Sequence, residues 1–209
     1  MNMRSLVAAL GVSTALICGL IWLAAAAFLR LKKRKSLVYL LSFTVFYVYI
    51  IAVLDYTMFQ FQSILLLNYL SPNHLLLKGD TVKQGLNLVP LVTLRFADLK
   101  TSLLNILMLV PFGFGLPFIT KLRMRSVVVA GALLSVTIEL LQLLTGLMAH
   151  MTFRIADIND VIFNTLGGAV GYLLFIRFMR IYRRMHGNGE IAAHPVSRYL
   201  GERPPVDAP

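Results

Sequence analysis

The stretch RIADINDVIFNTLGGAVG, residues 154–171, decides the fold of this chain, because it carries charge directly into a run that otherwise resembles a membrane helix. Asp157, Asp160 and Asn164 follow one another at intervals of three and four residues, so they lie on one stripe of a helix. The stripe continues with small residues: Gly167, Gly168 and Gly171. This face is therefore polar where the helix begins and able to pack closely against a neighbouring helix further along.

The rest of the composition places this helix in a membrane. The chain of 209 residues is 58% hydrophobic and 14% charged, with a mean hydropathy of +0.76. Five windows approach the roughly 20 helical residues that a bilayer core requires: Ser5–Leu29, Ser36–Leu54, Thr101–Thr120, Ser126–Leu147, which contains Glu139, and Val161–Ile176, which is entered through Asp160. We therefore predict an all-α, polytopic membrane bundle of about five transmembrane helices over residues 1–185.

Two segments do not fit a transmembrane helix. Residues 61–77 begin with the apolar run FQSILLLNYL, which is too short to span, and continue into SPNH, which interrupts regular structure. We predict that this segment is interfacial or re-entrant. Residues 186–209 lack an apolar period and contain Pro and Gly, so we predict a disordered cytoplasmic tail.

The basic residues predict the orientation. With five spans, 14 of the 20 Lys and Arg residues fall on one side and six on the other. The positive-inside rule then places the N-terminus outside and the C-terminus in the cytoplasm. The net charge of +11 is explained by this signal and by attraction to anionic inner-leaflet lipid, so we expect no nucleic-acid partner. The single cysteine, Cys18, excludes an intramolecular disulfide.

Polar residues from several predicted helices fall at the same depth. Glu139 lies eight residues before Leu147, or roughly 12 Å below the outer end of its helix at about 1.5 Å per residue. A charge at this depth is costly unless it is paired, protonated or facing water. Asn105 enters the membrane from the same side, in a helix where Pro111 and Gly113 predict a kink or break.

We therefore predict one outward-facing pocket in the outer leaflet. Its candidate lining residues are Asn87, Asn105, Glu139, Gln142, Arg154, Asp157, Asp160 and Asn164. The candidate helix-packing residues are Pro111, Gly113, Gly167, Gly168 and Gly171. A purely structural alternative pairs Glu139 with Arg154 and uses the two aspartates to cap the last helix.

Four segments together resemble the VanZ-like family of small membrane proteins, named for a teicoplanin-resistance determinant. They are NLVPL (87–91), NILMLVPFGFGLP (105–117), IELLQ (138–142) and RIADINDVIFNTLGGAVGY (154–172). The resemblance covers about residues 84–177. It implies a multi-pass protein of the bacterial plasma membrane that confers or modulates resistance to lipophilic glycopeptide or lipopeptide antibiotics.

Three classes of function stay open. In the first, the pocket binds a membrane lipid, a lipid-linked wall precursor or the acylated drug, without a cofactor. In the second, an intramembrane enzyme acts on a lipid-linked substrate, with Glu139 as general base and Asp157 and Asp160 holding a divalent cation, although the sequence has no nucleophile motif. In the third, a polar seam serves a small transporter or lipid scramblase. The G-x-x-x-G spacing fits internal packing or a homodimer, so the oligomeric state also stays open.

Overall fold

The computed structural model of the chain describes residues 3–70, 86–91, 98–148, 156–185, 194–201 and 203. Within these ranges, five helices are long and apolar enough to cross a membrane. The predicted all-α bundle of about five spans is therefore confirmed, and the chain is a multi-pass membrane protein. The long helices are α1 (Met3–Ala27), which continues into the π-helical turn η1 (Phe28–Lys32), α2 (Leu37–Leu70), α3 (Asp98–Ile119), α4 (Met124–Met148) and α5 (Ile158–Met185).

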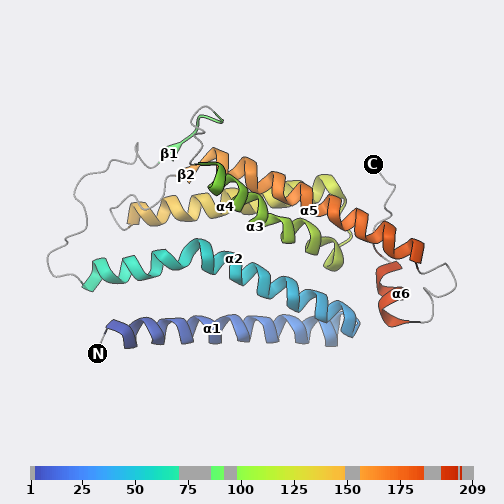
Figure 1. The fold of residues 1–209 in the computed structure, drawn as a ribbon. Coiled ribbons are helices and arrows are strands. Elements are labelled where there is room, and N and C mark those ends of the chain that lie inside the picture. The colour runs from blue at the N-terminus through green and yellow to red at the C-terminus, as the bar shows by residue number, and fades with distance from the viewer. Residues whose placement is uncertain are drawn as a thin grey trace.

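The helices lie side by side, with α3, α4 and α5 grouped together and α1 on the outer side of α2 (Figure 1). No residue in the apolar window of α1 is buried. Two hydrogen bonds connect α1 to α2: Trp22 Nε1 donates to Thr44 Oγ1 at 3.1 Å, and the Tyr47 hydroxyl donates to the Cys18 carbonyl at 2.8 Å. Because α1 is peripheral, the polar residues of the other four helices carry the predicted site.

Glycines bring α3 and α5 into backbone contact. A Cβ atom added at Gly113 on α3 would overlap the carbonyl group of Gly168 on α5. Two glycines of α5 meet α3 carbonyl groups in the same way: Gly167 with Ile106, and Gly171 with Val110. The G-x-x-x-G spacing is therefore used for packing between two helices of one chain.

Of the kink or break predicted at Pro111, the break is wrong, because α3 runs without interruption from Asp98 to Ile119. The kink stays a prediction. Proline removes one backbone N–H from the helical ladder, and membrane helices tolerate this loss when neighbouring groups support the backbone. The Tyr49 hydroxyl on α2 donates to the Met108 carbonyl at 2.7 Å, in the turn that precedes Pro111. This bond ties α2 to α3 where the proline weakens the ladder.

The segment predicted to be re-entrant or interfacial begins as helix. Residues 61–70 continue α2, whose 34 residues make it longer than the roughly 20 residues needed to cross a bilayer. Residues 61–70 therefore form no re-entrant turn, while residues 71–77 lie outside the described part of the chain. The re-entrant alternative is therefore wrong for residues 61–70, while the interfacial alternative stays a prediction, since a helix that projects beyond the hydrocarbon reaches the membrane interface.

The predicted disorder of residues 186–209 is wrong for its central part. Pro195–Gly201 forms α6, in which Tyr199 and Leu200 are buried in a hydrophobic cluster with residues of α4 and α5. The Tyr199 hydroxyl donates to the Phe118 carbonyl at the end of α3, and the hydroxyl groups of Tyr182 and Ser197 are 2.7 Å apart. Tertiary contacts therefore order a helix too short to show an apolar period. The rest of the tail, except residues 194 and 203, lies outside the described residues.

Polar and basic side chains gather at opposite ends of the bundle. The strands β1 (Leu86–Asn87) and β2 (Ala156–Asp157) lie where α3 and α5 begin, whereas the α1–α2 connection and α6 lie at the other end (Figure 1). The α1–α2 connection contains RLKKRK, residues 30–35. The basic residues of this connection therefore lie at the opposite end of the bundle from the polar residues, as the charge count predicts. The assignment of the basic end to the cytoplasm stays a prediction from the positive-inside rule.

Candidate polar site

The polar site is built where α5 begins. β1 and β2 pair in parallel, with Asn87 opposite Asp157. Asp157 Oδ1 accepts hydrogen bonds from Asn87 Nδ2 at 3.0 Å and from the Asn159 backbone N–H at 2.8 Å. Asp157 therefore caps the first turn of α5, where free N–H groups and the helix dipole favour a carboxylate.

Amide side chains hold the loop that follows β1. Asn87 Oδ1 accepts from the Val89 N–H at 3.2 Å, and Asn159 Oδ1 accepts from the Leu91 N–H at 2.8 Å. Leu91 has a φ of 63°, a left-handed conformation that is unfavourable for a residue with a large side chain. Asn159, which is buried, thus fixes an otherwise unfavourable backbone and docks the loop against α5.

Glu139 on α4 is buried, with 8% of its surface exposed. Its Oε2 accepts a hydrogen bond from the Asp157 backbone N–H at 3.1 Å. The carboxylate therefore lies close to the N-terminal end of α5, where the helix dipole is positive and favours an anion. This contact connects α4 to β2 and gives the deeply placed acid at least one hydrogen-bond donor.

Two more hydrogen bonds connect α5 to its neighbours. Asn105 Nδ2 on α3 donates to Asp160 Oδ1 at 2.6 Å, a short hydrogen bond. One turn further along α5, Asn164 Nδ2 donates to Ser135 Oγ on α4 at 2.8 Å. Asn164 is 1% exposed, and its Oδ1 has no hydrogen-bond partner among the residues that the structure describes. An unsatisfied buried acceptor costs about 1–3 kcal/mol, so this oxygen is an unusual feature of the site.

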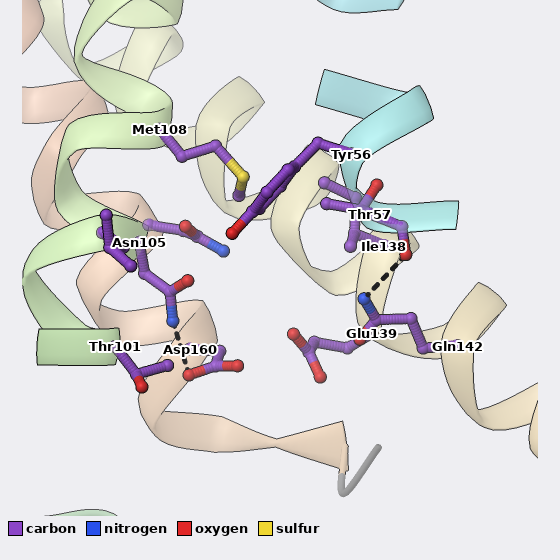
Figure 2. A pocket seen from close by; sticks show the side chains of 11 residues that line it. Tyr56, Thr57, Thr101, Asn105, Met108, Ile138, Glu139, Gln142 and Asp160 are labelled. Carbon is purple, nitrogen blue, oxygen red and sulfur yellow. Dashed lines mark hydrogen bonds between the residues drawn. The ribbon is translucent and has the colours of Figure 1, made fainter. Parts of the chain in front are cut away.

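These side chains surround a small cavity between α2, α3, α4 and α5 (Figure 2). Its volume is ≈ 50 Å³, whereas one water needs about 10–15 Å³. Figure 2 shows the carboxylates of Glu139 and Asp160 directed into this space from different helices. The cavity can hold a few waters or one small polar group, but an acyl chain does not fit. Its lining comprises Tyr56, Thr57, Thr101, Leu104, Asn105, Met108, Ile138, Glu139, Gln142, Asp160 and Asn164.

The structure places the predicted pocket residues in three groups. Five of them line the cavity: Asn105, Glu139, Gln142, Asp160 and Asn164. Asn87 and Asp157 do not line it, and they belong instead to the hydrogen-bonded junction that supports Glu139. Arg154 lies outside the described residues.

The geometry separates the two aspartates named as candidate cation ligands. Asp160 lines the cavity, whereas Asp157 uses Oδ1 to accept two hydrogen bonds at the start of α5. Within the part of the chain that the structure describes, no group of three or more His, Cys, Asp and Glu side chains is placed to hold a metal ion. Glu139 and Asp160 are the carboxylates that a cation in the cavity would meet.

Sequence reasoning missed several members of the site. Ser135 lies four residues before Glu139 on the same face of α4, so the helical period could have identified it. Asn159 was missed because it lies off the stripe formed by Asp157, Asp160 and Asn164. Thr57 gave no local signal, since its carbonyl meets Gln142 Nε2, at 3.4 Å, across 85 positions of sequence.

The chain matches a known protein family. A family model described as VanZ/LLP1 matches residues 43–180, which is more than half of the chain. The match extends further toward the N-terminus than the predicted range of 84–177 and takes in α2 from residue 43 onward, including Tyr56 and Thr57, which line the cavity. No curated protein and no solved structure matches the chain. The chain is a member of the VanZ/LLP1 family of membrane proteins.

Proposed function

We propose that this protein modulates resistance to lipophilic glycopeptide or lipopeptide antibiotics. In this proposal, the cavity at the polar end of the bundle binds a polar group that belongs to a lipid, to a lipid-linked wall precursor or to the drug. The observation that carries the proposal is Asn164 Oδ1, a buried acceptor without a hydrogen-bond partner among the described residues. The Asn164 side chain lines a cavity of ≈ 50 Å³ together with Glu139 and Asp160. Family membership supports a VanZ-like membrane protein. The cavity supplies a place where such a protein could act.

The lining of the cavity favours a ligand group that donates hydrogen bonds. Asn164 Oδ1 and the carboxylates of Glu139 and Asp160 are acceptors. An N–H or O–H group that reached Asn164 would recover the energy lost by its unpaired oxygen. An amine, amide or hydroxyl group therefore fits the described lining better than a phosphate would.

The size of the cavity places the apolar part of the ligand outside it. Leu104 lines the cavity and is exposed, and Leu107 beside it on α3 is 62% exposed. An acyl chain attached to the bound polar group would lie along these residues in the lipid phase. The proposed ligand therefore combines a small polar group, held inside the bundle, with an apolar chain in the membrane.

The outward orientation is part of the proposal. It rests on the charge distribution. The cavity is lined by residues near the beginning of α3 and α5, and these helices begin at the end of the bundle opposite to the α1–α2 connection, which contains the basic residues 30–35 (Figure 1). An outward cavity would meet the outer leaflet, where lipophilic antibiotics and lipid-linked wall precursors are both present.

Drug susceptibility tests the proposal. A sensitive Gram-positive host would express the wild type, Glu139→Gln, Asn164→Leu or the control Thr137→Ala, at matched protein levels in the membrane. Thr137 is exposed on α4, two residues from Glu139, so its loss leaves the cavity unchanged. We expect protection against teicoplanin, but not against unacylated vancomycin, from the wild type and the control. Full protection by both cavity variants would contradict the proposal.

The geometry of the described residues favours neither of the other two functions. The enzymatic hypothesis used Asp157 and Asp160 together, and the structure assigns Asp157 to the start of α5. The transport hypothesis needs a polar seam, and the α3–α5 interface beyond Asn164 is closed by backbone contact at Gly167 and Gly171.

A further inference from the structure

A second pocket, of ≈ 340 Å³, lies at the basic end of the bundle. It forms between the α1–α2 connection and the segment that contains α6, which are more than 150 residues apart in sequence. Five basic side chains line it: Lys33, Arg34, Lys35, Arg198 and Arg203. We propose that this pocket binds a phosphate group, presented by an anionic membrane lipid.

The charge of the lining indicates an anionic ligand. Among the described residues that line the pocket, five are basic and none is acidic. Cationic side chains held around one space repel each other, and a bound anion removes that repulsion. Arginine and lysine also provide the N–H donors that phosphate oxygens accept.

The pocket is held in shape by contacts that do not involve a ligand. Arg203 is 7% exposed, and it donates from Nε to the Tyr199 carbonyl at 3.1 Å and from Nη1 to the Phe118 carbonyl at 2.8 Å. Its guanidinium lies 4.2 Å from the centre of the Tyr199 ring. Tyr199 in turn packs edge-on against Tyr39 of α2, with ring centres 6.3 Å apart. The α6 side of the pocket is therefore already positioned when a ligand arrives.

The other side of the pocket is fixed by the backbone between α1 and α2. Arg34 has a φ of 49°, which turns the chain sharply, and Arg30 Nη1 donates to the Lys35 carbonyl at 2.9 Å. Ser36 Oγ accepts from the Tyr39 N–H at 3.2 Å at the start of α2. Lys33, Arg34 and Lys35 follow one another in this turn and all line the pocket. Lys35 Nζ lies 4.8 Å from the centre of the Tyr39 ring, which also lines it.

The position of the pocket identifies the source of the phosphate. Lys33, Arg34 and Lys35 stand between two membrane-spanning segments, Gly11–Lys32 and Leu37–Thr57. The pocket therefore lies at the level of the lipid head groups, where basic pockets between membrane helices bind anionic lipids. A phospholipid can place its phosphate among these side chains while its acyl chains stay in the bilayer.

Lipid binding by the purified full-length protein tests this inference. The protein, in a neutral detergent, would be titrated with phosphatidylglycerol, with zwitterionic phosphatidylcholine and with inorganic phosphate, and bound lipid counted by native mass spectrometry. The variant Lys35→Gln/Arg198→Gln removes two charges of the pocket. The control Lys121→Gln/Arg125→Gln removes two exposed charges that do not line it.

We expect the wild type and the control to prefer phosphatidylglycerol over phosphatidylcholine. The pocket variant should bind phosphatidylglycerol about 30-fold more weakly than the wild type does, because each basic residue near an anionic lipid usually contributes about 1 kcal/mol to binding and the variant lacks two. Equal loss in both double variants would overturn the inference, since it would reduce the effect to overall charge. Equal affinity for the two lipids would overturn it as well. Competition by inorganic phosphate at the same concentration as the lipid would overturn the lipid source. Unchanged melting temperatures would show that the pocket variant is folded.

Discussion

Gly167 and Gly168 are neighbours on α5, yet the structure predicts opposite responses to the same substitution. A Cβ atom at Gly167 would overlap the Ile106 carbonyl group of α3. A Cβ atom at Gly168 would meet no heavy atom within 4 Å. Gly167→Ala should therefore destabilise the bundle, whereas Gly168→Ala should leave it unchanged or stabilise it.

The magnitude follows from two effects of the added methyl group. Replacing glycine by alanine inside a helix is favourable by about 1 kcal/mol, and this gain is common to both variants. Forcing extra volume into a closely packed contact costs about 1–3 kcal/mol, and this cost falls on Gly167→Ala alone. The difference in the free energy of unfolding between the two variants should therefore be about 1–3 kcal/mol, in favour of Gly168→Ala.

Steric trapping in lipid bicelles would measure these free energies with the full-length protein. Gly19→Ala is a suitable control, because Gly19 lies on the peripheral helix α1 and an added Cβ meets nothing within 4 Å there. The control should behave as Gly168→Ala does. Equal stability of Gly167→Ala and Gly168→Ala would refute the reasoning, because it would mean that α3 and α5 do not touch at Gly167.

Two further predictions concern single hydrogen bonds. Asn159→Ala removes the acceptor for the Leu91 N–H, so hydrogen exchange of residues 88–91, followed by mass spectrometry, should become faster. Asn159→Asp keeps an acceptor oxygen and should preserve the protection. Unchanged exchange in Asn159→Ala would contradict the docking of this loop. Thr44→Val removes the hydrogen-bond acceptor for Trp22, the single tryptophan. The loss should lower the free energy of unfolding by about 0.6 kcal/mol and shift the indole fluorescence emission to shorter wavelength. An emission spectrum unchanged from the wild type would show that this bond is not formed.

The helical period explains which parts of the site could be predicted from sequence. Glu139 and Gln142 share a face of α4, and Asp160 and Asn164 share a face of α5, because residues three or four apart always do so on a helix. All four line the same cavity. Their convergence could be anticipated because both helices turn their polar faces away from lipid, where an exposed charge is costly.

Contacts between segments distant in the chain could not be predicted in this way. No pattern in α2 indicates that Tyr49 would reach the Met108 carbonyl on α3. The sequence of α6 also gives no signal of its own, since Tyr199 is buried by residues of α4 and α5 and donates to the Phe118 carbonyl at the end of α3. These features depend on how helices pack, and one sequence does not encode that packing as a repeating pattern.

The depth of the cavity limits how the proposed function could distinguish between drugs. Beyond Asn164 the interface between α3 and α5 is closed at Gly167, so a ligand can insert only a small polar group. Such a group is common to acylated and unacylated glycopeptides, so the cavity alone cannot separate them. On the proposed function, selectivity for a lipophilic drug must come from the part of the ligand that remains in the lipid phase, beside exposed residues such as Leu107. Lengthening the acyl chain on a fixed drug scaffold should then increase protection, while substitutions inside the cavity should reduce protection against every chain length alike.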